Sequence, residues 1–288
     1  MSLFFLGLNP RWQMYKFLPS GLNVMFSAAG FWDGYGWRRK RFPRWAGLRW
    51  LDCGGFTMLN KYGDYPFSVV NYANLVARLK PNYYATMDYP CEPEISRSLG
   101  LMSNRERIRA TVENALRLAE WESQLPGRLV PVIQGYELEE YEYCIRLYRQ
   151  AGMIREYMAV GSMCRRISTE EIRRLIPGIY RAARQAGCER LHFFGLKLSP
   201  DLIPLGKYIW SRDSAVALDA YDAELRKRRG GRRWPRGQAE KRTALSAFLR
   251  RLDDLGLRYT SPTAPRAAGE APDVRRYRCY RYPLPIGE

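Results

Sequence analysis

Short apolar runs recur along the chain and alternate with stretches in which apolar residues are spaced three or four positions apart. Short runs that end in small or acidic residues are typical of buried strands, and the wider spacing is typical of helices that bury one face. The expected strands lie at 24–28, 49–51, 84–87, 129–133, 157–160, 191–194 and 208–210. Their alternation with helical stretches predicts βα units and a parallel sheet.

Three helices are predicted most clearly by their apolar stripes. Ser103 and Glu106 have the spacing of a capping box in front of the first stripe, and Ser168 and Glu171 repeat that spacing in front of another. The stripes consist of Ile108, Val112, Ala115, Leu116 and Ala119; of Leu138, Tyr141, Ile145 and Tyr148; and of Ile172, Leu175, Ile176 and Ile179. Because proline lacks a backbone N–H, we expect Pro177 to kink or split the last of these helices.

The placement of polar and glycine-rich motifs distinguishes two parallel architectures. Such motifs follow six successive expected strands, and a (β/α)8 barrel gathers the carboxyl ends of all its strands on one face. An open doubly wound sheet, the competing fold, concentrates them at one switch point. We therefore predict an α/β fold, a (β/α)8 TIM barrel over residues 1–260 with basic insertions, followed by a Pro/Ala-rich linker and an Arg/Tyr-rich tail at 261–288.

The charge of the chain points to a polyanionic partner. Lysine and arginine number 47 against 29 acidic residues, for a formal net charge of +18, which favours nucleic acid. Basic residues are dense at 37–49 and 226–242, and we expect both stretches to be loops outside the barrel. Arginine suits phosphate pairing, and the interleaved tryptophans suit base stacking. The expected nucleic-acid-binding residues are Arg38, Arg39, Lys40, Arg41, Arg228, Arg229, Arg232 and Arg233.

Cysteine and histidine usage narrows the possible chemistry. The six cysteines form no C-x-x-C pair, and His192 is the one histidine, which excludes a two-histidine metal site and gives no sign of a disulfide framework. We expect a cytoplasmic protein without a signal peptide or membrane span, with no zinc and no other cofactor. His192 lies in an apolar run and is expected to belong to the core or to support the site. Carboxylates must then carry any acid–base chemistry.

Acidic and amide residues stand at the ends of the expected strands. Asp52 is followed by two glycines, which allow a ligand to approach the backbone closely. Asp88 ends the strand at 84–87, Gln134 ends the strand at 129–133, and Asp213 follows the strand at 208–210. The spacing of strands on a barrel face predicts that these side chains surround one pocket.

The ordered set of motifs resembles the guanine transglycosylase superfamily. The matching segments are Asp52, Cys53, Gly54, Gly55 and Phe56; Asp88; Gln134 and Gly135; Ala159, Val160 and Gly161; Phe194 and Gly195; and Asp213. The resemblance implies that Asp213 is the nucleophile, Asp52 the general acid/base, and Asp88 and Gln134 the residues that recognise the base. It also implies base contacts from Gly54, Gly55, Phe56, Gly135, Met158, Ala159, Gly161, Phe194 and Gly195.

Two departures from the superfamily pattern affect the substrate. Cys53 replaces a serine, and the Cys-x-Cys-x-x-Cys segment that binds zinc in tRNA-modifying members is absent. In this respect the chain is similar to the DpdA-type DNA transglycosylases, which implies replacement of guanine in DNA by 7-cyano-7-deazaguanine (preQ0), with DNA, a 7-deazaguanine base and helper proteins as partners. A tRNA-guanine transglycosylase, a simple base-excising glycosylase and a non-catalytic nucleic-acid-binding barrel are the alternatives.

Overall fold

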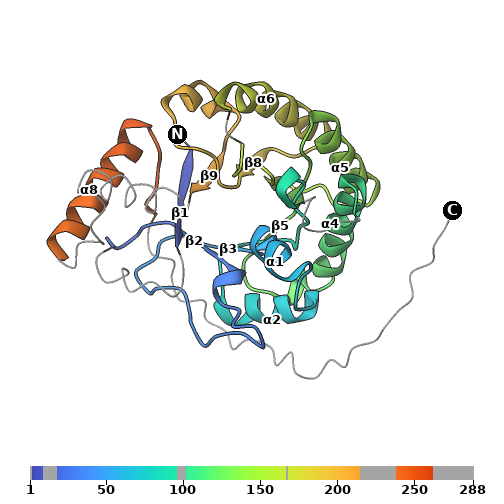
Figure 1. Cartoon of the computed structure of the whole chain (residues 1–288), viewed down its shortest axis with the longest axis horizontal. Coiled ribbons are helices and arrows are strands. Elements are labelled where there is room, and N and C mark those ends of the chain that lie inside the picture. The colour runs from blue at the N-terminus through green and yellow to red at the C-terminus, as the bar shows by residue number, and fades with distance from the viewer. Residues whose placement is uncertain (1, 9–17, 96–101, 167, 215–237, 262–288) are drawn as a thin grey trace.

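The computed structural model describes residues 2–8, 18–95, 102–166, 168–214 and 238–261, and within them nine parallel strands form one sheet (Figure 1). The strands are β1 (Leu3–Leu8), β2 (Val24–Ser27), β3 (Arg49–Asp52), β4 (Tyr83–Ala85), β5 (Arg128–Val130), β6 (Val132–Ile133), β7 (Tyr157–Val160), β8 (Arg190–Phe193) and β9 (Ser211–Ser214). Their order is β5-β4-β3-β2-β1-β9-β8-β7-β6. The two ends of this order are consecutive in the chain, as a barrel requires.

Pro131 separates β5 from β6 and lies where the barrel closes. Proline has no N–H to donate to a neighbouring strand, so the strand assignment is interrupted there. The segment nevertheless joins both ends of the sheet, because Thr86 N donates to Val130 O (3.1 Å) and Ala159 N donates to Pro131 O (2.8 Å). β5 and β6 therefore together form the strand expected at 129–133, which closes the barrel. The predicted (β/α)8 fold is confirmed.

Helices surround most of the barrel (Figure 1). They are α1 (Gly55–Tyr62), α2 (Val69–Leu79), α4 (Asn104–Ala119), α5 (Leu138–Gln150), α6 (Thr169–Ala186) and α8 (Gln238–Asp254), with short 3₁₀ helices η2 (Ala28–Gly30), η3 (Glu122–Gln124) and η4 (Pro200–Lys207). The capping box of Ser103 and Glu106 begins α4 as expected. Pro177 does not split the last of the predicted helices, because α6 continues as one helix from Thr169 to Ala186. Leu116 is also not a core residue, since 38% of it is exposed.

The first and last strands differ from the sequence prediction. β1 was not expected as a strand, yet it pairs with β2 on one side and with β9 on the other. The strand expected at 208–210 lies later, at Ser211–Ser214, so that Asp213 is inside β9. The shift arises because β9 is polar in sequence, although all four of its residues are buried.

The basic stretch at 37–49 is a loop that leads into β3, as predicted. Phe42 and Ala46 are buried in the core, and the Trp37 indole N–H donates to Asn71 O (3.0 Å), so the loop is anchored to α2. The second stretch is only partly described. Residues 238–242 begin α8 and are helical, which corrects the expected loop, whereas 226–237 lie outside the described residues.

The C-terminal part of the described chain returns to the barrel. α8 lies beside β1 (Figure 1), where the ring of Phe248 contacts that of Phe4 at a centroid distance of 6.2 Å. Beyond α8, Arg258 N donates to Ser2 O (2.9 Å) and Ser261 N donates to Gly21 O (2.8 Å). The predicted boundary near 260 stays a prediction, because the tail at 262–288 lies outside the described residues.

The interior of the barrel is packed rather than open. Its buried cluster consists of Phe5, Met25, Trp50, Ala85, Val130, Val132, Tyr157 and Ala159. A larger cluster fills the space between strands and helices, as expected for a parallel sheet covered by helices. Among the helices described, none is long and apolar enough to cross a membrane. Polar side chains at the carboxyl ends of the strands therefore stand on a rigid apolar base.

Candidate active site

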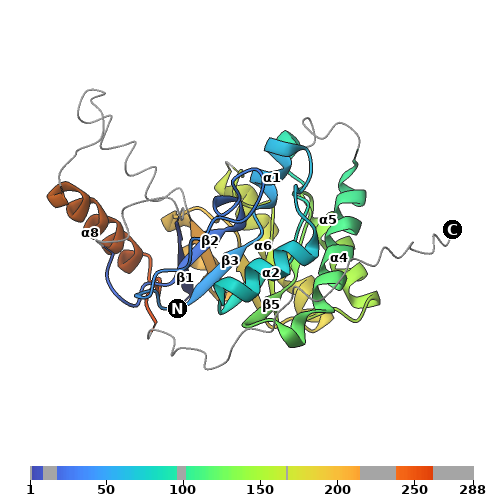
Figure 2. The same cartoon turned by 90° about the horizontal axis from the view of Figure 1, so that it is seen from below.

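Asp52 is the last residue of β3, next to the start of α1, which covers one end of the barrel when the molecule is seen from the side (Figure 2). Its carboxylate accepts a hydrogen bond from Gly54 N (3.1 Å) and one from the Ser27 side chain. Gly54 has φ = 81°, in the left-handed region that favours glycine, and a Cβ there would lie 2.7 Å from Ser27 Oγ. Because glycine has no side chain, the backbone after Asp52 can pack closely against Ser27 at the end of β2.

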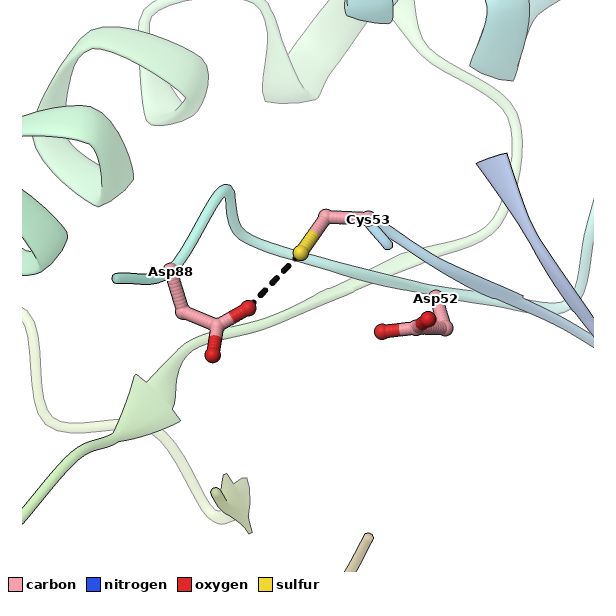
Figure 3. A group of neighbouring side chains, drawn as sticks. All are labelled: Asp52, Cys53 and Asp88. Atoms are coloured by element: carbon pink, nitrogen blue, oxygen red, sulfur yellow. Dashed lines mark hydrogen bonds between the residues drawn. The ribbon is translucent and has the colours of Figure 1, made fainter. Parts of the chain in front are cut away.

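Asp88 follows β4, and the Cys53 thiol points toward it with the Asp52 carboxylate nearby (Figure 3). Cys53 Sγ donates to Asp88 Oδ1 (2.7 Å) and lies 3.2 Å from the Tyr65 hydroxyl, which donates to Asp88 O (2.6 Å). Burial and the neighbouring carboxylates hold the pKa of the Cys53 thiol well above its ordinary value. The thiol therefore stays protonated and serves as the donor that a serine hydroxyl would provide.

Gln134 follows β6 directly and is 1% exposed. Its Nε2 donates to Asp88 Oδ2, and its Oε1 lies 2.8 Å from the Ser162 hydroxyl. Gly161 lies against the Gln134 amide, and a Cβ at that position would overlap it. The three strand ends after β4, β6 and β7 thus hold one carboxylate and one amide side by side.

Asp213 projects from β9 and is 7% exposed. Gly195 N donates to its Oδ1 (2.8 Å), and His192 Nε2 lies 3.2 Å from the same oxygen. His192 Nδ1 lies 2.7 Å from Ser211 Oγ, so a neutral imidazole that accepts from Ser211 donates to Asp213. Burial lowers the pKa of His192, although Asp213 opposes this, which favours the neutral ring. Among the described residues, both of these contacts are made to the same carboxylate oxygen, Oδ1.

Asp52 has the perturbed acidity of a group that exchanges protons near neutral pH. Burial raises its pKa to about 7, and the charges of Asp88 and Asp213 act in the same direction, whereas the hydrogen bonds from Ser27 and Gly54 lower it. Burial also raises the pKa of Asp88, opposed by its hydrogen bonds from Cys53 and Gln134. The three carboxylates at the carboxyl ends of β3, β4 and β9 therefore interact electrostatically.

Asp52, Cys53 and Asp88 could in principle hold a metal ion, because one ligand atom of each lies within 4.8 Å of the others. Their contacts account for the arrangement without a metal, since the protonated Cys53 thiol bonds to Asp88. A thiol must lose its proton to bind a metal, and the neighbouring carboxylates oppose that loss. The absence of a cofactor stays a prediction.

The structure places the remaining predicted base-binding residues in different surroundings. Gly55 packs on Asp88, and Phe56 lies at the start of α1 under the Arg165 guanidinium, 4.8 Å from its ring centroid. Phe194 and Ala159 belong to the barrel interior. Met158 instead packs between strands and helices.

Gly135 packs where α5 begins. A Cβ added to it would lie 2.6 Å from Tyr141 N, so glycine is needed there for packing.

His192, which was expected to belong to the core or to support the site, is buried and contacts the predicted nucleophile. Sequence reasoning missed three other residues that the structure brings to this site. These residues are Tyr65, Ser162 and Glu92. Tyr65 contacts Cys53, Ser162 contacts Gln134, and the buried Glu92 contacts Ser162. Ser162 has φ = 54°, which its position after the motif ending at Gly161 could have suggested as a sharp turn.

Of the predicted nucleic-acid-binding residues, Arg39, Lys40 and Arg41 are exposed and Arg38 is partly exposed. They lie on the loop between β2 and β3, whose first part follows Ser27 at the carboxyl end of β2. Arg228, Arg229, Arg232 and Arg233 lie outside the described residues.

Together, the closed parallel barrel and the carboxylates of Asp52, Asp88 and Asp213 at the carboxyl ends of its strands form the arrangement typical of a (β/α)8 enzyme site. The family model for DpdA, described as DeoxyPurine in DNA protein A, matches residues 36–225, which is more than half of the chain, and the protein belongs to this family. The predicted resemblance is thus confirmed. Membership implies a transglycosylase that acts on DNA. No curated protein matches the chain.

Proposed function

We propose that the protein exchanges guanine in DNA for 7-cyano-7-deazaguanine through a covalent intermediate on Asp213. The observation that carries the proposal is the gathering of Asp52, Asp88 and Asp213 at the carboxyl ends of three strands, where burial and the charges of the other two carboxylates raise the pKa of Asp52. A nucleophilic carboxylate and a second carboxyl group that is half protonated near pH 7 are what a two-step base exchange needs.

In the first step, the free oxygen of Asp213 attacks C1′ of the deoxyribose. The bond between C1′ and the guanine nitrogen breaks, its electron pair stays with guanine, and protonated Asp52 donates a proton to the leaving base. In the second step, the incoming base loses its N9 proton to the Asp52 carboxylate. Its nitrogen attacks C1′ and releases Asp213. Asp52 is then protonated again, so that protons balance over the cycle.

Asp88 and Gln134 are suited to recognise the edge that guanine and 7-deazaguanines share. This edge has two adjacent N–H donors and one carbonyl acceptor, which a carboxylate and an amide N–H complement. Cys53 and Gln134 both donate to Asp88, which favours its ionised, accepting form. The same edge on both bases explains how one pocket binds the leaving and the incoming base.

The activity is tested by incubating the protein with labelled 7-cyano-7-deazaguanine and either duplex DNA or tRNA. We expect the label to enter DNA and unlabelled guanine to leave in equal amount. Helper proteins are added from the organism's lysate if the purified protein is inactive. Label in tRNA would contradict the DNA substrate, and release of guanine with abasic sites but no incorporation would identify a glycosylase.

The basic loop gives a prediction for DNA binding. Replacing Arg39, Lys40 and Arg41 by serine is expected to weaken DNA binding and to flatten the dependence of log Kd on log salt by roughly 0.9 for each DNA phosphate that the loop no longer neutralises. The same measurement on a variant with serine at Arg228, Arg229, Arg232 and Arg233 assigns the share of the second basic stretch.

Two controls separate local contacts from net charge. Arg149, Arg181 and Arg184 are exposed and lie toward the C-terminal ends of α5 and α6, at the opposite end of the barrel, so that their replacement removes the same charge elsewhere. Asp88→Ala is expected to abolish base selection without changing the salt dependence. If the loop variant keeps the wild-type slope, the loop does not contact the DNA backbone.

A further inference from the structure

We infer that Glu92 holds a proton and, through Ser162, fixes the orientation of the Gln134 amide that recognises a guanine-type base. Glu92 is 2% exposed and lies on the segment after Asp88. Its carboxyl oxygens lie 2.8 Å from Ser162 Oγ and 3.5 Å from Cys164 Sγ, one hydrogen bond away from the amide, so it is a positioning residue rather than a catalytic one. The inference rests on the proposed base-binding role of Asp88 and Gln134.

The single hydrogen of the Ser162 hydroxyl determines which group donates in each of its contacts. Its Oγ accepts from Cys91 N (2.9 Å) and lies 2.8 Å from both Glu92 Oε2 and Gln134 Oε1. A hydroxyl has one proton and two acceptor positions, and the carbonyl oxygen of an amide can only accept. Ser162 must therefore donate to Gln134. The remaining contact with Glu92 is a hydrogen bond only if Glu92 donates its own proton to Ser162.

The opposite orientation of the Gln134 amide requires the proton to lie elsewhere. If Gln134 donated to Ser162, Ser162 could donate to an ionised Glu92, but the amide oxygen would then face Asp88 Oδ2. That contact would require a proton on Asp88. The chain of four groups is thus fully hydrogen-bonded with one proton, which sits either on Glu92 or on Asp88. The position of the proton and the orientation of the amide are linked.

The surroundings favour the proton on Glu92. Burial raises the pKa of Asp88 too, but Asp88 accepts from Cys53 as well as from Gln134, and both hydrogen bonds stabilise its ionised form. Burial raises the pKa of Glu92, and the charge of Asp88 adds to this, whereas its hydrogen bonds with Ser162 and Cys164 oppose it. Among the residues that the structure describes, the other titratable or charged groups that interact with Glu92 include Cys91, Cys164, Arg107 of α4 and Tyr141 of α5. Arg107 is the cation among them and favours ionisation.

The two arrangements differ in the bases they accept. With the proton on Glu92, Asp88 is an acceptor for two base N–H groups, and the second N–H of the Gln134 amide is available for a base carbonyl. With the proton on Asp88, neither the ionised carboxylate nor this donor is available to the base. Protonated Glu92 therefore keeps Asp88 and Gln134 in the arrangement that complements a guanine-type edge. Loss of this proton at high pH is expected to weaken base binding.

Glu92→Gln tests this directly, because the glutamine amide donates to Ser162 at every pH. We expect its Kd for guanine at pH 7 to stay within about twofold of wild type, since the hydrogen bond is kept. As pH rises, wild type is expected to lose guanine affinity at lower pH than Glu92→Gln does. Ser162→Ala should raise Kd roughly tenfold with either residue at position 92, because the relay is broken.

Glu94→Gln is the matched control, since Glu94 is an exposed carboxylate two residues away and should change nothing. Infrared difference spectra of wild type against Glu92→Gln should contain the carbonyl band of a protonated carboxyl group at neutral pH. A loss of affinity of more than tenfold in Glu92→Gln, or the absence of that band, would overturn the inference. If wild type binds no guanine, the proposed function fails, whereas the infrared result still decides the state of Glu92.

Discussion

Asp213→Asn is expected to abolish base exchange, by roughly 10⁴-fold or more, while leaving the fold and DNA affinity unchanged. Asparagine keeps the shape of the side chain and can accept from Gly195 N and His192, which hold one oxygen of Asp213. It lacks the second carboxylate oxygen, which in the proposed mechanism attacks C1′. The loss of activity should therefore appear in the chemical step and not in binding.

Denaturing gel electrophoresis measures the same step directly. Wild-type protein incubated with guanine-containing DNA in the absence of an incoming base should form a covalent protein–DNA adduct, and Asp213→Asn should form none. Asp201→Asn is the control, because Asp201 is an exposed carboxylate on η4 and lies outside the pocket. An adduct at wild-type level with Asp213→Asn would assign the nucleophile to another residue.

The acidic site could be predicted because parallel strands bring residues far apart in sequence to one edge. Asp52, Asp88 and Gln134 each follow an apolar run that the sequence marks as a strand, and the closed barrel places them together. For Asp52, Asp88 and Gln134, the position at the end of a predicted strand was enough to predict that their side chains lie close together.

Other features of the site have no such signal. β9 is polar in sequence, because Ser211 and Asp213 are buried through hydrogen bonds with His192 rather than through apolar packing. A hydrophobic pattern cannot show a strand whose burial is satisfied by partners elsewhere in the chain. Glu92 and Ser162 meet only after the turn that follows β7 brings their loops together. β1 was missed although its run, Leu3–Leu8, is as apolar as those of the strands that were predicted.

Asp52→Asn is expected to slow turnover by about 10²- to 10⁴-fold, the usual contribution of a general acid/base, while still allowing some covalent intermediate to form. The mutation removes the proton donor and acceptor of both steps but leaves Asp213 in place. In the proposed mechanism, release of guanine in a single turnover needs protonated Asp52, and burial raises the pKa of Asp52 to about 7. Its rate should therefore fall as pH rises through 7, and that fall should be absent from Asp52→Asn.

The same raised pKa gives Asp52→Asn an opposite effect on stability. The folded protein holds the Asp52 proton more tightly than the unfolded chain, so wild type loses stability as pH rises from the ordinary value of 3.8 to about 7. Asparagine carries no charge at any pH. The variant is therefore expected to unfold at higher denaturant concentration than wild type above pH 7, and the difference should shrink toward pH 4. Equal activity and equal stability of the two proteins across this range would remove Asp52 from the mechanism.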